Sequence, residues 1–158
     1  MVGEVSKPNG PKFYLLHGHM TDEEMHGLYT HPDVKALVTF THGEGYGLPI
    51  LEAAACGLPV IATNWSGHLD FLKLGKFIPV DCSVNTIHES RVDNQIFMKD
   101  TKWAYPVEAD AKRRLKKFYE APQMPQQWAK ELAVKVCETF SFESVARIYS
   151  ATFEEHLK

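Results

Sequence analysis

The feature that most constrains the fold is a glycine-rich bend, HGEGYGLP (residues 42–49), between an apolar run and a short helical segment. Residues 34–40 (VKALVTF) are rich in β-branched and apolar side chains, which favours a strand. After the bend, Pro49 suits a first helical turn, LEAAAC favours the helix, and Gly57 suits its end. Residues 60–63 (VIAT) are a further short apolar run. This order predicts strand, helix and strand, the unit of a parallel sheet.

The same alternation continues on both sides of the bend. Thr21 with Glu24 three positions later forms a capping box, which predicts a helix from Thr21 to about Tyr29. A short apolar run predicts a buried strand at residues 13–16 (FYLL). Residues 77–80 (FIPV) are a further strand candidate, which Pro79 weakens, and a short helix is expected over 68–74. After residue 81 the pattern changes. A loop with an uncertain strand is expected over 81–105, and helices over 107–119, 126–140 and 142–157, the last of them capped by Ser141.

Composition narrows the class of protein. The 158 residues suit one domain, and a net charge of −3 does not favour a nucleic-acid partner. No apolar run approaches the roughly 20 residues of a membrane span, and the first residues lack a hydrophobic signal core. The three cysteines are far apart and odd in number, which predicts reduced, mostly buried thiols in a cytoplasmic protein.

The bend has the chemistry of a phosphate site. Gly45 and Gly47 allow positive φ and a close approach by another molecule, and the amides of residues 45–48 would lie at a helix N-terminus, which favours anions. Glu44 precedes the bend and Glu52 lies one turn beyond it, and a carboxylate matches a vicinal diol. A nucleotide sugar has this layout, with a diphosphate in the middle and hydroxyl groups on the ribose and on the sugar at its two ends. Spacing alone leaves open a second interpretation, in which Glu52 is a solvated acid favoured by the helix dipole.

Residues 42–72 (HGEGYGLPILEAAACGLPVIATNWSGHLDFL) resemble the donor-site signature of family-4 retaining glycosyltransferases, which have the GT-B fold. That signature is an acid, Gly-aromatic-Gly-Leu-Pro, a second acid, Ala-Cys-Gly-x-Pro-Val-Ile-Ala and a glycine-containing loop. Here these elements are Glu44, residues 45–49, Glu52, residues 55–62 and Ser66-Gly67. Weaker similarity extends to residues 17–34, 102–120 and 140–149. The resemblance implies an α/β fold: a Rossmann-like parallel sheet with helices on both faces, the C-terminal half of a GT-B architecture, with a helical part at 107–158.

The resemblance also implies roles. Glu44 would contact the transferred sugar near the reacting centre, and Glu52 would bind the ribose hydroxyls. Other donor-binding positions would be Gly45, Tyr46, Gly47, Leu48 and Gly67 around the diphosphate and sugar, with Gly18 and His19 near the base. The family transfers a sugar to an acceptor glycan or other hydroxyl compound with retention. It usually needs no metal or other cofactor, because protein dipoles stabilise the departing diphosphate.

Two departures from the family pattern limit what is expected of the isolated chain. The chain is too short to include the N-terminal acceptor domain, and upstream of Glu44 only Lys7, Lys12 and Lys35 are basic, none in the family's Arg–Lys spacing. A separate N-terminal domain or chain is therefore an expected partner. The alternatives are a non-catalytic nucleotide-sugar-binding module or fragment, and an unrelated α/β nucleotide enzyme such as a dehydrogenase. The sequence lacks the GxGxxG spacing that is typical of dehydrogenases, which does not favour that alternative.

Other residues carry weaker signals. His17 and His19 flank Gly18 without a third metal ligand at suitable spacing, and His42 and His68 are candidate phosphate donors or structural residues.

Two groups on the C-terminal helices also allow a functional and a structural interpretation. The basic run within residues 112–117 suits a solvated helix face or an anionic surface, and Trp103 and Trp128 suit core packing or ring stacking. The residues expected to form the packed stripe of the last helix are Phe140, Phe142, Ile148 and Tyr149.

Overall fold

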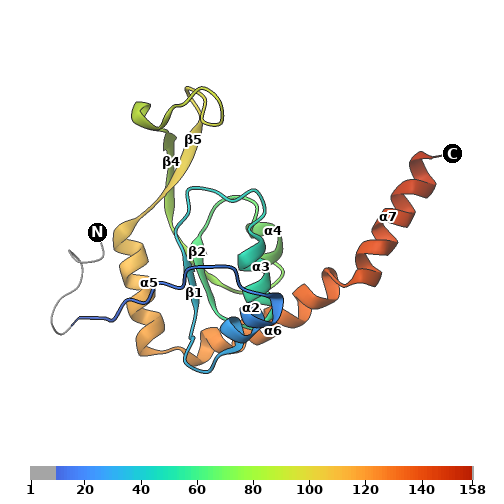
Figure 1. The fold of residues 1–158 in the computed structure, drawn as a ribbon, viewed down its shortest axis with the longest axis horizontal. Coiled ribbons are helices and arrows are strands. Elements are labelled where there is room, and N and C mark those ends of the chain that lie inside the picture. Colours follow the sequence, from blue (N-terminus) through green and yellow to red (C-terminus); the bar gives the residue numbers. More distant parts are fainter. Residues whose placement is uncertain (1–9, 158) are drawn as a thin grey trace.

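The structure, a computed structural model, describes residues 10–157, and its centre is a three-stranded parallel sheet (Figure 1). The strands lie in the order β1-β2-β3, with bounds Leu37–Thr39, Val60–Thr63 and Ile78–Val80. Val38 pairs with Ile61, and Ala62 with Pro79. Proline forms part of β3 because β3 is an edge strand, where a missing N–H is tolerated. The expected parallel α/β class is confirmed.

Helices cover both faces of this sheet, as expected. The bounds are α3 Leu48–Ala55, α4 Leu69–Leu72, α5 Glu108–Glu120 and α6 Gln123–Thr139. Along β2, Val60 and Ala62 pack in the cluster that includes side chains of α3, α4 and α6, whereas Ile61 packs in the cluster with Ala111 of α5. Successive side chains of a strand point to opposite faces, so β2 serves both cores and all four of its residues are buried.

The helix before β1 forms as its capping box predicts. α2 spans Asp22–Thr30, the Thr21 hydroxyl accepts from the Glu24 amide, and the Glu24 carboxylate accepts from the Thr21 amide. Tyr29 is its buried residue and packs with Ala53 and Leu58. α2 therefore contacts the body of the protein along one face, with Met25 partly buried beside the same cluster.

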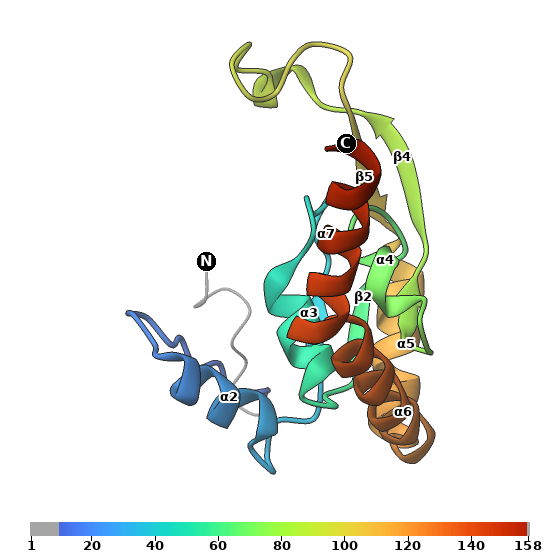
Figure 2. The ribbon, with the colours of Figure 1, turned by 90° about the vertical axis from the view of Figure 1, so that its right-hand side faces the viewer.

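Residues 13–16 are wrongly predicted as a buried strand. They have no regular secondary structure, and all four side chains are exposed, Leu15 to 87%. Figure 2 shows the segment before α2 standing apart from α3 and the sheet. A strand needs a neighbour for its backbone groups, and no strand pairs with this segment within residues 10–157.

Residues 81–105 contain more regular structure than expected. β4 (Cys82–Thr86) and β5 (Lys102–Pro106) form an antiparallel hairpin, with a short 3-10 turn at Glu89–Arg91 in the connection. The hairpin rises beyond the end of the parallel sheet (Figure 1). The sequence signal is weak because fifteen residues, 87–101, separate the two strands, so no tight-turn motif marks the pairing.

The last helix forms, but its predicted packing is wrong. α7 spans Phe142–His156, and the Ser141 hydroxyl caps it by accepting from the Ser144 amide at 3.2 Å. The helix projects away from the sheet (Figure 1), and the four residues of the predicted stripe are exposed: Phe140, Phe142, Ile148 and Tyr149. The periodicity predicted an apolar face correctly, but no segment within residues 10–157 buries that face.

The cysteines are free thiols, but they are less buried than expected. Cys137 is exposed, and Cys56 and Cys82 are half-buried. Burial raises the pKa of the Cys56 and Cys82 thiols.

Candidate functional site

The bend lies between the end of β1 and the start of α3, as the sequence predicts. Gly47 is the N-cap of α3 in the left-handed conformation (φ 87°), and Pro49 lies in the first turn. The Gly47 carbonyl accepts from the amides of Ile50 and Leu51. Within residues 10–157, the amides of residues 45–48 donate to no protein acceptor. Unpaired amides at a helix start are the elements of an anion site.

A second loop, between β2 and α4, holds the bend in place. The Glu44 amide donates to Ser66 Oγ (2.7 Å), and the Gly67 amide donates to the Glu44 carbonyl (3.2 Å). The contact is so close that a Cβ at Gly67 would lie 2.2 Å from the Gly45 carbonyl oxygen. Glu44, Gly45 and Gly67, three predicted site residues, are therefore brought together. Gly67 supports the bend by allowing this contact.

Buried polar groups beneath the bend connect it to β2. The His68 ring is 0% exposed, and its Nε2–H donates to the Thr63 carbonyl at 2.7 Å. The Thr63 hydroxyl donates to the Thr41 carbonyl at 3.2 Å. In the described part of the chain, His68 Nδ1 and Thr41 Oγ1 are the buried side-chain atoms without a partner. The suggestion that His68 donates to phosphate is wrong, because the ring is fully buried and its donor is already used.

The two acids have different surroundings. Glu44 is half-buried and its backbone is held on both sides. The Glu52 carboxylate is exposed on α3 and accepts from the Tyr29 hydroxyl at 3.4 Å. Burial raises the pKa of the Tyr29 phenol, and the Glu52 carboxylate raises it further. Tyr29 thus contacts one carboxylate oxygen of Glu52, and the other oxygen has no hydrogen-bond partner within residues 10–157.

Tyr46 anchors the middle of the bend. Its ring lies 5.4 Å from that of Phe71 and 6.3 Å from that of Phe140, in tilted and edge-on arrangements. Such aromatic pairs favour offset or edge contacts. Leu48 is exposed at the start of α3. The bend therefore directs one half-buried ring, that of Tyr46, against the core, while Gly45 and Leu48 on either side are exposed.

His42 fastens the β4–β5 hairpin to the bend. Its Nδ1–H donates to the Ala104 carbonyl (2.8 Å), and the Ala104 amide donates to the His42 carbonyl (3.1 Å). Its ring stacks on Trp103 at 4.6 Å with an interplanar angle of 9°. Sequence reasoning missed this connection and the Tyr29–Glu52 contact. Pairs 62 and 23 positions apart leave no local pattern.

Gly18 and His19 lie before α2. They line a shallow cavity of about 470 Å³ whose lining residues all fall within 16–31, so none of the bend residues contributes to it. Across residues 10–157, no three His, Cys, Asp or Glu side chains gather as metal ligands. The structure thus brings Glu44, Gly45 and Gly67 together at the bend, with Glu52 on the helix that follows it, and the role of Gly18 and His19 stays a prediction.

A parallel sheet with helices on both faces and a glycine-rich turn at a strand's carboxyl end defines the Rossmann-like α/β class. Within this class, the chain belongs to the family described as glycosyl transferases group 1, whose model matches residues 10–132. The match includes the bend, both acids and the Ser66–Gly67 loop, and it connects the chain to glycosyl transfer.

A curated relative gives a shorter match. The chain is similar to O-antigen chain mannosyltransferase B of Escherichia coli, with 43% identity over 47 residues. These residues are 30% of this chain and 12% of that protein, so the chain spans a small part of the relative. Among the helices of residues 10–157, none is long and apolar enough to cross a membrane.

Proposed function

We propose that this chain is the donor-binding part of a retaining glycosyltransferase of family 4, the C-terminal half of a GT-B architecture. The observation that carries this proposal is the row of unpaired amides at residues 45–48, at the start of α3 and held by the Ser66–Gly67 loop. These amides bind the diphosphate of a nucleotide sugar. The partial positive charge of the helix start stabilises the diphosphate as it departs with the bonding electrons.

The two acids bind the ends of the donor. Glu52 accepts from the ribose hydroxyls through the oxygen that Tyr29 does not use. Glu44 contacts the transferred hexose and stabilises the positive charge that develops at its anomeric carbon. Its fixed backbone supports this role, because a carboxylate stabilises a transition state best when it is positioned beforehand. The hexose passes to an acceptor hydroxyl with retention and without a metal ion, in the cytoplasm.

A separate N-terminal domain or chain supplies the acceptor side. Two apolar surfaces support the need for a partner, namely residues 13–16 and the exposed face of α7. The second candidate function is a non-catalytic module that binds the nucleotide sugar and acts only with that partner. It is favoured by the same two exposed apolar surfaces, since a module that acts through a partner needs a surface for that partner.

Calorimetry with UDP and GDP tests the binding proposal. Glu52→Gln keeps the size of the side chain and removes its charge, and we expect it to weaken binding about tenfold, the effect of about 1.4 kcal/mol from a charged hydrogen bond. Glu155→Gln makes the same charge change on α7 and should leave affinity unchanged. Equal affinity of Glu52→Gln and wild type would show that Glu52 does not bind the ribose. Chelation of metals should not alter the titration.

Turnover distinguishes an enzyme from a module. The chain is incubated with a panel of nucleotide sugars that begins with mannose donors, and release of free sugar or nucleotide is measured. Release that Glu44→Gln abolishes, with donor binding retained, supports catalysis. Binding without release under any condition supports the module.

A further inference from the structure

A cavity of about 320 Å³ lies beside the edge strand β3, where α5 ends and α6 begins. Its volume is at the lower end of the range for ligand pockets. The small Ala121 and the cyclic Pro125 complete an apolar lining whose other side chains are Phe77, Ile78, Pro79, Phe118, Met124 and Trp128. They come from three elements, so the cavity is a product of the tertiary fold rather than of one helix surface.

The lining has few polar side chains, and all of them are hydrogen-bond donors. Arg114 and Lys117 are its two charged side chains, and no carboxylate, amide or hydroxyl side chain lines the cavity. Sugar hydroxyls and nucleobase edges need hydrogen-bond acceptors as well as donors, and the side chains of this lining provide no acceptor. The lining instead suits an apolar body that carries one negative group.

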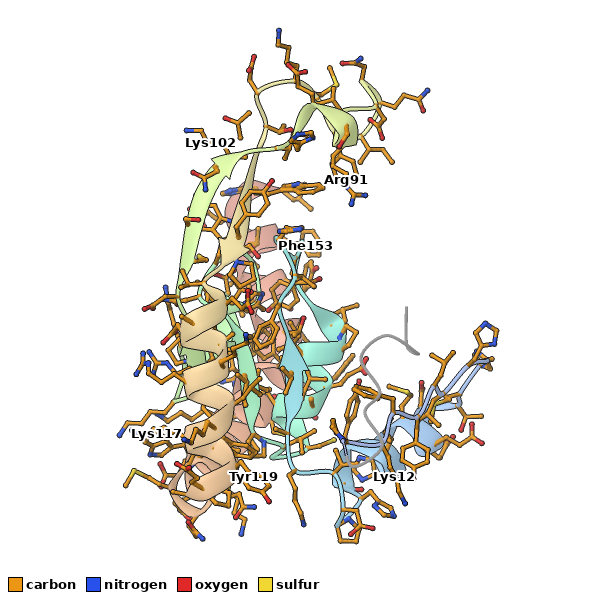
Figure 3. All side chains as sticks on the ribbon, turned by 90° about the vertical axis from the view of Figure 1, so that its left-hand side faces the viewer. Lys12, Arg91, Lys102, Lys117, Tyr119 and Phe153 are labelled. Atoms are coloured by element: carbon orange, nitrogen blue, oxygen red, sulfur yellow. The ribbon has the colours of Figure 1, made fainter. Side chains whose placement is uncertain are left out.

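The two cations are placed differently from the rest of the basic run on α5. Lys112, Arg113 and Lys116 are each paired with an acid of the same helix, which confirms that most of the run is a solvated face. Arg114 Nε lies 3.3 Å from Asp110, which fixes its side chain. Lys117 forms no salt bridge anywhere in residues 10–157. Figure 3 shows Lys117 extending outward near the C-terminal end of α5.

This cavity is separate from the bend. Phe77 and Ile78 lie at the amino end of β3, whereas the bend follows the carboxyl end of β1. Because the strands are parallel, the cavity and the bend lie at opposite ends of the strands. None of residues 42–52 lines the cavity. A ligand here would therefore not compete with a nucleotide sugar.

We propose that the cavity binds a single amphiphile, an apolar chain with one terminal phosphate or carboxylate. The chain lies against Phe77, Phe118 and Trp128, and its anionic group contacts Lys117 and Arg114. Charge complementarity carries the choice of ligand: the protein has a net charge of −3, yet both charged groups of this apolar cavity are cations. Lys76, 5.5 Å from the Trp128 ring centroid, adds a third cation nearby.

Calorimetry with the full chain tests the proposal, using decyl phosphate and decanoate below their aggregation concentrations. We expect saturable one-to-one binding of both and none of inorganic phosphate. Lys117→Gln should weaken binding of both about fivefold, the effect of losing one partly exposed ion pair. Lys116→Gln removes the same charge one residue away, outside the cavity, and should have no effect.

A second variant tests the apolar part. Ala121 lines the cavity and is exposed, so Ala121→Phe should obstruct the cavity and abolish binding while the thermal unfolding curve stays close to wild type. Equal weakening by Lys116→Gln and Lys117→Gln, or unchanged binding to Ala121→Phe, would overturn the proposal. The proposal would also be overturned if the chain sedimented with anionic phospholipid vesicles but did not bind decyl phosphate saturably. That result would indicate a surface that binds membranes.

Discussion

Residues 13–16 (FYLL) and 60–63 (VIAT) are two apolar runs of equal length with opposite fates. VIAT forms β2, lies between β1 and β3, and is buried throughout. FYLL has no regular secondary structure and is exposed, and no strand pairs with it in the described part of the chain. Length and apolar character are alike in the two runs, so they do not explain the difference, and the neighbours of each run do. A short parallel strand is stable only where other strands satisfy its backbone and helices cover its faces.

The largest test of this comparison replaces one apolar residue in each run. Ile61→Ala removes a fully buried side chain from β2 and should lower the free energy of unfolding by about 3 kcal/mol, because it leaves a cavity. Leu15→Ala removes a side chain that is 87% exposed and should change it by less than about 0.5 kcal/mol. Urea unfolding followed by circular dichroism measures both.

Similar losses in the two variants would mean that residues 13–16 pack against the body in solution. The same two variants can also be compared in the presence of a partner domain. If an N-terminal domain is added and Leu15→Ala then becomes costly, the run is a strand that lacked its neighbours.

The next test concerns the bend, where backbone rather than side chains is closely packed. Gly67→Ala puts a methyl group against the Gly45 carbonyl oxygen, and we expect a loss of about 2 kcal/mol from overpacking. Gly45→Ala is the matched control, since a Cβ there meets nothing within 4 Å and should change stability by less than about 0.5 kcal/mol. Thermal unfolding compares them, and equal stability would show that the two loops are not in contact.

Local signals in the sequence predicted much of the fold. The capping residues Thr21 and Ser141 located the starts of α2 and α7, and the bend located α3, because each acts on amides within three positions. The hairpin and the exposure of FYLL and α7 were missed. Both depend on contacts between distant segments, or on the absence of such contacts, and periodicity describes only which face is apolar.

The candidate site divides in the same way. The glycines, the helix start and the two acids are adjacent in sequence, so their common location was predictable. The groups that hold them are distant: Ser66 binds the Glu44 amide, Tyr29 binds Glu52, and Ala104 binds His42. No pattern within one segment identifies these pairs. Gly18 and His19 were assigned to the donor site by resemblance alone; they line a cavity to which no bend residue contributes, and their role stays a prediction.

The smallest expected effect lies on α7, which extends the comparison to the other end of the chain. Phe153 is 54% exposed on the projecting helix (Figure 3), so Phe153→Ser should change the free energy of unfolding by less than about 0.5 kcal/mol. Val136, 1% exposed on α6, provides the contrast, since Val136→Ala leaves a cavity in the core. A loss above about 1 kcal/mol for Phe153→Ser would show that α7 folds back onto the body in solution. A near-zero effect, with less self-association in sedimentation velocity, would identify the apolar face of α7 as a surface that another domain or chain covers.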